Sequence, residues 1–279
     1  MERDPVDRLE QAIIESTERI RSAFTNRGVV DDENPSGEQQ LAADVAADEL
    51  LAERFGAIDG IGSYASEERR SVLDIGEGLS VTVDPLDGSS NLGPNNPVGT
   101  IVAAYESTLP ARGDDLVAAW FVLYGPLTTV VGTRGETVVE SVVVDGAVVR
   151  ERTVSIPSSP TIYGFGGRVP EWPSDFEAVA NEIATELKLR YGGAMVADVN
   201  QVLTHGGIFA YPALSSAPQG KLRLQFEAIP MAAIVEAAGG ASSDGRQSLL
   251  QVDPSDLHQR TPVHLGNEPL IDRIESALG

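Results

Sequence analysis

The most informative part of this sequence is the stretch Val81-Thr82-Val83-Asp84-Pro85-Leu86-Asp87-Gly88-Ser89-Ser90-Asn91. Its β-branched residues predict a strand that ends in two aspartates, and the turn after them supplies a glycine and two hydroxyls. Mg²⁺ prefers carboxylate and carbonyl oxygens, whereas phosphate is bound by free N–H groups of turns and helix N-termini. The segment therefore meets the local requirement for metal-assisted hydrolysis of a phosphate ester. Simple turn chemistry stays open as an alternative, because Asp-Pro and Asp-Gly are ordinary turn pairs.

Three further acidic clusters add to this one. Glu67 and Glu68 follow a short apolar-polar run, Glu38 and Asp44 begin an expected helix, and Glu227 ends an expected strand. An adjacent glutamate pair is also typical of a solvated face, and a lone glutamate can simply favour the helix that follows it. Taken together, these carboxylates and the first stretch resemble a site for several magnesium ions.

Composition and charge restrict the class of protein. The chain has 279 residues, of which 42% are apolar, which excludes global disorder. We expect no membrane span, because no run of about 18 apolar residues occurs, and no secretory signal at the N-terminus. The absence of cysteine excludes disulfides and thiol catalysis and fits a cytoplasmic protein. The net charge of −22 should repel nucleic acid, so we expect no nucleic-acid partner.

The same charge bears on salt and on phosphate. Only two of the 20 basic residues are lysines, Lys188 and Lys221. We interpret the acidity as adaptation to a cytoplasm with concentrated salt, an acidic mesophilic protein being the alternative. Because protein and phosphate repel each other at long range, a phosphate site here must be built locally from cations, arginines and amide dipoles.

Basic and hydroxyl groups that suit such a site gather in the second half, at Arg190, Tyr191, Tyr211, Lys221 and Arg223. Arginine grips phosphate with a planar fork and lysine acts as a point charge. A strand-surface cation is the alternative for Lys221. The three histidines show no metal-ligand spacing, and we assign them no catalysis.

Apolar spacing predicts an α/β protein with a mixed or antiparallel sheet. The predicted helices cover residues 6–24, 38–55, 175–188, 230–238 and 268–278, and the predicted strands cover residues 79–84, 98–105, 116–123, 127–132, 137–144, 146–154, 205–213 and 221–227. The proline- and serine-rich segment 155–160 is the best linker candidate.

Several of these stretches resemble class I fructose-1,6-bisphosphatases. The matches keep the family's order from about residue 36 to residue 266, and comprise 84–91, 190–191, 195–198, 206–209, 220–227, 230–232, 238–240 and 258–260. The related inositol monophosphatases share 84–88 but usually carry threonines in place of Ser89 and Ser90, and they lack the strand 221–227.

The resemblance implies a five-layered α/β/α/β/α sugar-phosphatase fold with two mixed sheets, and a homotetramer or homodimer. Residues 1–157 would form a helix-plus-mixed-sheet domain with most metal ligands, and 158–279 an α/β domain that binds the sugar phosphate.

The resemblance also assigns roles. By position, two or three Mg²⁺ ions, with Mn²⁺ as an alternative, would be held by Glu67, Asp84, Asp87, Glu227 and the carbonyl of Leu86. Asp44 and Glu68 would activate water, and Glu38 would help with the metal. Gly88, Ser89, Ser90 and Asn91 would hold the 1-phosphate. The sugar and 6-phosphate would be held by Tyr191, Tyr211, Lys221 and Arg223, with Arg190 reaching in from a neighbouring subunit.

The implied activity is Mg²⁺-dependent hydrolysis of the 1-phosphate of fructose 1,6-bisphosphate, a step of gluconeogenesis. The alternatives are a sedoheptulose-1,7-bisphosphatase, an inositol or sugar monophosphatase, and, from other classes, a non-catalytic cation-binding protein or a plain acidic structural protein.

Two departures from the family pattern affect this expectation. The family's phosphate-binding Asn-Glu-Gly-Tyr segment is Phe165-Gly166-Gly167-Arg168 here, which weakens the expected grip on the 6-phosphate unless Arg168 compensates. The lysine and tyrosine of the family's AMP site are Gly78 and Leu79 here, so we do not expect AMP inhibition.

The salt interpretation predicts that molar KCl stabilises the fold, because salt screens the repulsion between surface carboxylates. Chemical unfolding curves in low and in molar KCl measure this. Equal stability in both would contradict the interpretation.

Overall fold

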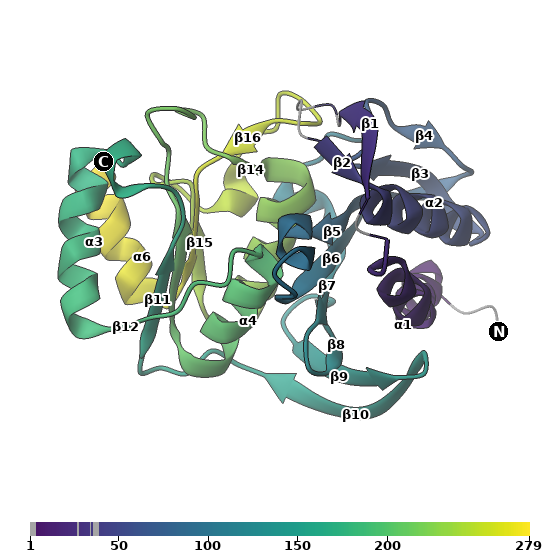
Figure 1. The fold of residues 1–279 in the computed structure, drawn as a ribbon, viewed down its shortest axis with the longest axis horizontal. Helices are drawn as coiled ribbons and strands as arrows, with labels where there is room; N and C mark the ends of the chain where they lie inside the picture. The colour runs from purple at the N-terminus through teal and green to yellow at the C-terminus, as the bar shows by residue number, and fades with distance from the viewer. Residues whose placement is uncertain (1–3, 27, 34, 36–38) are drawn as a thin grey trace.

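The computed structural model describes residues 4–26, 28–33, 35 and 39–279, and their helices and sheets form five layers (Figure 1). The six helices of the described residues are α1 (Pro5–Ala23), α2 (Ala42–Gly56), α3 (Ser174–Glu186), α4 (Met195–His205), α5 (Ile229–Ala237) and α6 (Glu268–Leu278). Helices α1 and α2 form one outer layer, α3 and α6 form the other, and α4 and α5 lie between the two large sheets. The layer order is therefore α/β/α/β/α, as predicted.

The sheets are built as follows. The eight-stranded sheet has the order β10 (Ala147–Val154), β9 (Val138–Val144), β8 (Thr128–Thr133), β7 (Leu116–Tyr124), β6 (Val98–Tyr105), β5 (Gly78–Asp87), β3 (Gly60–Ser66), β4 (Leu73–Asp74). The five-stranded sheet has the order β12 (Lys188–Leu189), β11 (Ile162–Phe165), β13 (Gly207–Tyr211), β17 (Val263–Gly266), β15 (Ala241–Ser243). Two small ribbons pair β1 (Val29–Glu33) with β2 (Gln39–Leu41) and β14 (Leu222–Arg223) with β16 (Arg260–Thr261).

Three apolar cores hold the layers together. One packs α1 and α2 on the eight-stranded sheet around Leu51 and Trp120, and another packs α3 and α6 on the five-stranded sheet around Phe176. The central core surrounds α4 and α5 between the sheets, and it includes Met231, which is fully buried. Because α5 has apolar contacts on all sides, its sequence lacks a polar face.

One parallel pairing places acidic residues at a common edge. Strands β3 and β5 run parallel with Ser66 opposite Val83, so Glu67, which directly follows β3, lies beside Asp84, which is still part of β5 and pairs with Ile101 of β6. The other pairings of this sheet, within the described residues, are antiparallel. The sheet is therefore mixed, and its parallel pair brings two acidic clusters together.

Two element predictions in the second half were wrong. The strand expected at 221–227 ends at Arg223, because Leu224–Ala228 forms a π-helix that leads into α5. Glu227 therefore lies on a helix and not at the end of a strand. The strand expected at 205–213 is confined to Gly207–Tyr211, and the helix α4 before it was missed. Leu222, Leu224 and Phe226 alternate with polar residues, and this alternation is typical of a strand, which explains the first error.

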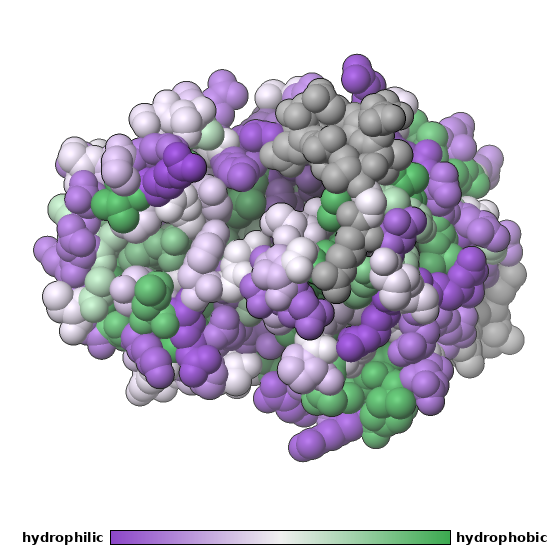
Figure 2. All heavy atoms as spheres, in the orientation of Figure 1, coloured by the Kyte–Doolittle hydropathy of each residue, from purple (hydrophilic) through white to green (hydrophobic). Residues whose placement is uncertain are grey.

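The face of the molecule in Figure 2 is mostly hydrophilic, as the charge predicts. The apolar residues at the lower right lie over the β9–β10 hairpin, where Val144, Val148 and Val149 are exposed. Within the part of the chain that the structure describes, no helix has the length and apolar character needed to cross a membrane.

Candidate active site

A cavity of about 450 Å³ lies where β5, the turn after β3, the start of α4 and the π-helix meet. Most of the predicted site residues line it. They are the acids Asp44, Glu67, Glu68, Asp84, Asp87 and Glu227, then Leu86, Gly88, Ser89 and Ser90, and finally Tyr191, Tyr211, Lys221 and Arg223. Acids that are far apart in the sequence thus converge on one space.

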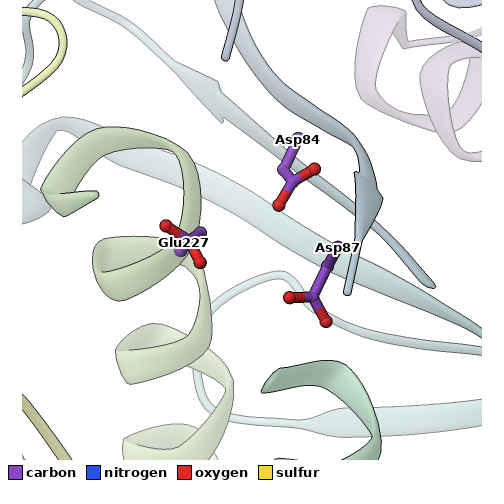
Figure 3. A group of neighbouring side chains, drawn as sticks. All are labelled: Asp84, Asp87 and Glu227. Atoms are coloured by element: carbon purple, nitrogen blue, oxygen red, sulfur yellow. The ribbon is translucent and has the colours of Figure 1, made fainter. Parts of the chain in front are cut away.

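Asp84, Asp87 and Glu227 form the centre of this acidic group. One oxygen of each carboxylate lies within 4.8 Å of the others, and Figure 3 shows all three side chains facing a common point from β5 and the π-helix. All three residues are buried. Such a set of hard oxygen ligands fits a divalent cation of the Mg²⁺ type.

Backbone contacts fix these three carboxylates. The amides of Met195 and Val196, at the start of α4, donate to the two oxygens of Asp87 at 3.2 and 2.8 Å. The amide of Leu86 donates to Asp84 Oδ1 at 3.0 Å, and the amide of Arg223 donates to Glu227 Oε2 at 2.6 Å. Helix N-terminal amides favour the charged carboxylate, so α4 holds Asp87 in place.

Glu67 lies beside this trio and pairs with a cation. Its amide donates to the carbonyl of Val83 at 3.0 Å, and its Oε1 lies 2.5 Å from Arg223 Nη1. Arg223 is itself buried, so its guanidinium is engaged with the acidic group.

The turn after β5 brings the backbone close to α4. Gly88 has a φ of 72°, and a Cβ there would lie 2.4 Å from the Cβ of Ala194. Only glycine suits both this conformation and this approach. Ser89 and Ser90 follow in a short 3-10 turn and border the cavity.

Burial and mutual repulsion raise the pKa values of the acids. Burial is the main cause for Asp84 and Glu227, whose pKa values rise well above the ordinary range, and the neighbouring Glu67 raises both further. Burial also raises the pKa of Asp87 to about 7, against the lowering effect of the α4 amides. Cations would relieve this repulsion.

Asp44 and Glu68 face the same space from two other elements. Burial raises the pKa of Asp44, near the start of α2, to about 6. Burial and then Glu67 raise the pKa of Glu68, in the turn after β3, to about 8. Both carboxyl groups therefore accept protons more readily than exposed carboxylates do.

Two predicted residues of the described part of the chain, Asn91 and Arg190, do not line the cavity. Glu38 lies outside the described residues. Asn91 is buried, and its side-chain amide donates to the carbonyls of Pro97 and Gly192 at 3.0 and 2.9 Å. Arg190 is exposed and its Nη1 donates to Gln201 Oε1 at 3.3 Å, so its reach into a neighbouring subunit stays a prediction.

Two polar residues of the cavity wall were missed. Gln40 donates from its side chain to Glu68 Oε2 at 2.5 Å, and nothing in the sequence indicated this contact. Asp198 is buried and accepts from the amides of Gly192 and Gly193 at 2.6 and 3.1 Å. Its place among apolar residues at helical spacing was a usable signal, because a buried acid needs partners.

Comparisons with known proteins agree with this geometry. The family model of the fructose-1-6-bisphosphatase N-terminal domain matches residues 8–149, and that of the C-terminal domain matches residues 156–279. The chain belongs to the fructose-1,6-bisphosphatase family. Among family members, it is 55% identical to the class 1 fructose-1,6-bisphosphatase of Natronomonas pharaonis, with 99% of both chains covered. It is 53% identical to that of Halobacterium salinarum, with 99% of this chain and 98% of the relative covered.

A solved structure extends the likeness to the fold. Leishmania major fructose-1,6-bisphosphatase in its holo form matches with a TM-score of 0.93 at 28% identity, over 99% of this chain and 95% of the other. The family and the five-layered fold that the sequence predicted are therefore confirmed.

The raised pKa values predict how the metal-free protein responds to pH. Because the pKa values of Asp44, Asp87 and Glu68 are higher in the folded than in the unfolded chain, the folded state binds more protons, so stability falls as pH rises from about 4.5 to about 8. Thermal melts in EDTA and molar KCl should show this fall, and it should be smaller for Glu68→Gln. A stability that does not depend on pH over this interval would contradict the prediction.

Proposed function

We propose that this chain hydrolyses the 1-phosphate of D-fructose 1,6-bisphosphate to fructose 6-phosphate and phosphate, with Mg²⁺ as cofactor. The chain is a phosphatase of the fructose-1,6-bisphosphatase class by its full-length likeness to that family. The observation that carries the proposal is that the acidic trio and the Gly88–Ser90 turn border one cavity. A metal site and a phosphate site thus lie against each other.

Asp84, Asp87 and Glu227 would hold the cations, together with Glu67 and the carbonyl of Leu86. Two or three ions per subunit is our proposal, and Mn²⁺ is the alternative metal. When bound, such ions neutralise phosphate charge, lower the pKa of water and stabilise a leaving alkoxide. They would also screen the substrate from an acidic wall that otherwise repels it.

Asp44 and Glu68 would remove the proton of the attacking water. Both line the cavity beside the trio, where the charge of Asp44 raises the pKa of Glu68 and the charge of Glu68 raises the pKa of Asp84. Hydroxide then attacks the phosphorus in line with the leaving sugar oxygen. Gly88, Ser89 and Ser90 would orient the 1-phosphate with backbone amides and hydroxyls.

Tyr191, Tyr211 and Lys221, which also line the cavity, would hold the sugar and the 6-phosphate. Gly166 packs against the ring of Tyr211, where a Cβ would lie 2.2 Å from the ring. Arg168 is exposed and does not border the cavity. Lys221 therefore carries most of the charge available to the 6-phosphate in this proposal.

Four wider assignments remain proposals. We propose the domain division at residues 157 and 158, a homotetramer or homodimer, a cytoplasmic location and adaptation to salt. The exposed Leu189 and Tyr191 on either side of Arg190 support a subunit contact there. The net charge of −22 supports the salt assignment.

Replacing one metal ligand tests the mechanism. Asp87→Asn should lower kcat by about 10³-fold or more, because losing a ligand removes several kcal/mol of transition-state stabilisation. Phosphate release from fructose 1,6-bisphosphate in molar KCl, with Mg²⁺ or with EDTA, measures this. Asp74→Asn is the matched control, because Asp74 is an exposed aspartate elsewhere in the same sheet. Near-normal turnover of Asp87→Asn would refute the assignment.

Replacing Lys221 tests the substrate. Lys221→Met should raise the KM for fructose 1,6-bisphosphate by about 10- to 100-fold, because a charge-assisted phosphate contact is worth about 1.5–3 kcal/mol. It should leave hydrolysis of a sugar monophosphate nearly unchanged. A panel that adds sedoheptulose 1,7-bisphosphate and inositol phosphate separates the alternatives. If the wild type hydrolyses a monophosphate faster than fructose 1,6-bisphosphate, the proposed substrate is wrong.

A further inference from the structure

A second layer of charged and polar groups lies behind the cavity acids. Asp48 follows Asp44 by one turn of α2, is 5% exposed and does not border the cavity. The hydroxyl of Tyr64, on β3, donates to Asp48 Oδ1 at 2.8 Å. The Nε of Arg69 lies 2.7 Å from Asp48 Oδ2.

Arg69 follows Glu68 directly and ties the turn to other elements. Its amide donates to the carbonyl of Ser66 at 3.1 Å, which closes the turn after β3. Its carbonyl oxygen lies 2.9 Å from His258 Nε2, and the ring of His258 packs on Phe226 at 5.2 Å between centroids. Phe226 precedes Glu227 in the π-helix, so Arg69 connects three elements that carry cavity acids.

Contacts with the turn after β3 lie on both sides of Asp44. Gln40 is on β2, just before α2 begins, and Asp44 and Asp48 are one turn apart on α2. Gln40 contacts Glu68 and Asp48 pairs with Arg69, so Asp44 lies between two residues that are bound to the turn. Because a helix is stiff over one turn, contacts that hold Asp48 also prevent Asp44 from shifting along the axis of α2 or rotating about it.

Neutralising a buried charge would explain the pair without any role in catalysis. Asp48 is buried and would be costly without partners, and Arg69 and Tyr64 supply them. The pair, however, joins the helix that carries Asp44 to the residue next to Glu68. A displacement of about 1 Å between reacting groups can lower a rate by about 100-fold.

We propose that Asp48 and Arg69, supported by Tyr64, form a positioning clamp that sets Asp44 and Glu68 at the separation needed to deprotonate one water. The clamp rests on the proposed function, in which these two carboxylates act together. Its three residues do not border the cavity, so they are positioning residues.

The test compares kcat, KM and the Mg²⁺ concentration at half-maximal rate for full-length variants. Asp48→Asn and Arg69→Gln should each lower kcat by about 10- to 100-fold and change KM and Mg²⁺ half-saturation by less than about threefold. The double variant should be no slower than the slower single one, because the pair acts as a unit. Arg69→Lys should recover part of the rate.

The chain offers matched controls. Glu49→Gln and Arg70→Gln remove exposed charges next to each clamp residue and should leave kcat within about twofold. If Asp48→Asn fails to melt cooperatively, Tyr64→Phe removes only one hydroxyl, and a several-fold lower kcat in a folded protein would support the clamp.

The other possible results contradict either the clamp alone or the proposed function as well. Singles that lose less than about threefold in kcat, or losses that multiply in the double variant, would overturn the clamp while an active wild type upholds the proposed function. Losses confined to KM or to Mg²⁺ half-saturation would overturn it as well. A wild type that releases no phosphate would overturn the proposed function and the clamp with it.

Discussion

Repulsion among carboxylates that are buried together is the constraint on which this site depends. Asp84, Asp87 and Glu227 are buried, and one carboxylate oxygen of each lies within 4.8 Å of the others. Burial raises the pKa values of these three acids, so they bind protons more readily than exposed carboxylates do, and in the ionised form they attract cations. The surrounding amides, above all those at the start of α4, hold the oxygens in place against this repulsion.

The same logic applies to the molecule as a whole. A chain with a net charge of −22 repels phosphate compounds at long range. Salt limits the range of this repulsion to about 10 Å or less. In the proposed function, attraction to phosphate would therefore arise inside the cavity, from bound cations, the Gly88–Ser90 turn and Lys221. The acidic surface and the acidic trio thus have different consequences. The surface makes the stability of the protein depend on salt, whereas the trio would make its activity depend on a metal ion.

Local chemistry predicted the strand and turn around Asp84 well, because β-branched residues, Asp-Pro and Asp-Gly are strong local signals. Local signals could not predict which distant segments of the chain contact each other. The parallel pairing of β3 with β5, which brings Glu67 beside Asp84, depends on the register of two strands. The π-helix that carries Glu227 has a sequence that alternates apolar and polar residues as a strand does, and nothing in the sequence indicated that Arg69 would pair with Asp48.

A crystal structure of the protein with Mn²⁺ and inorganic phosphate tests the central claim most directly. The account predicts anomalous-scattering peaks within bonding distance of Asp84, Asp87 and Glu227, with phosphate between these peaks and the Gly88–Ser90 turn. Side chains that point apart, or metal peaks only elsewhere on the acidic surface, would contradict it.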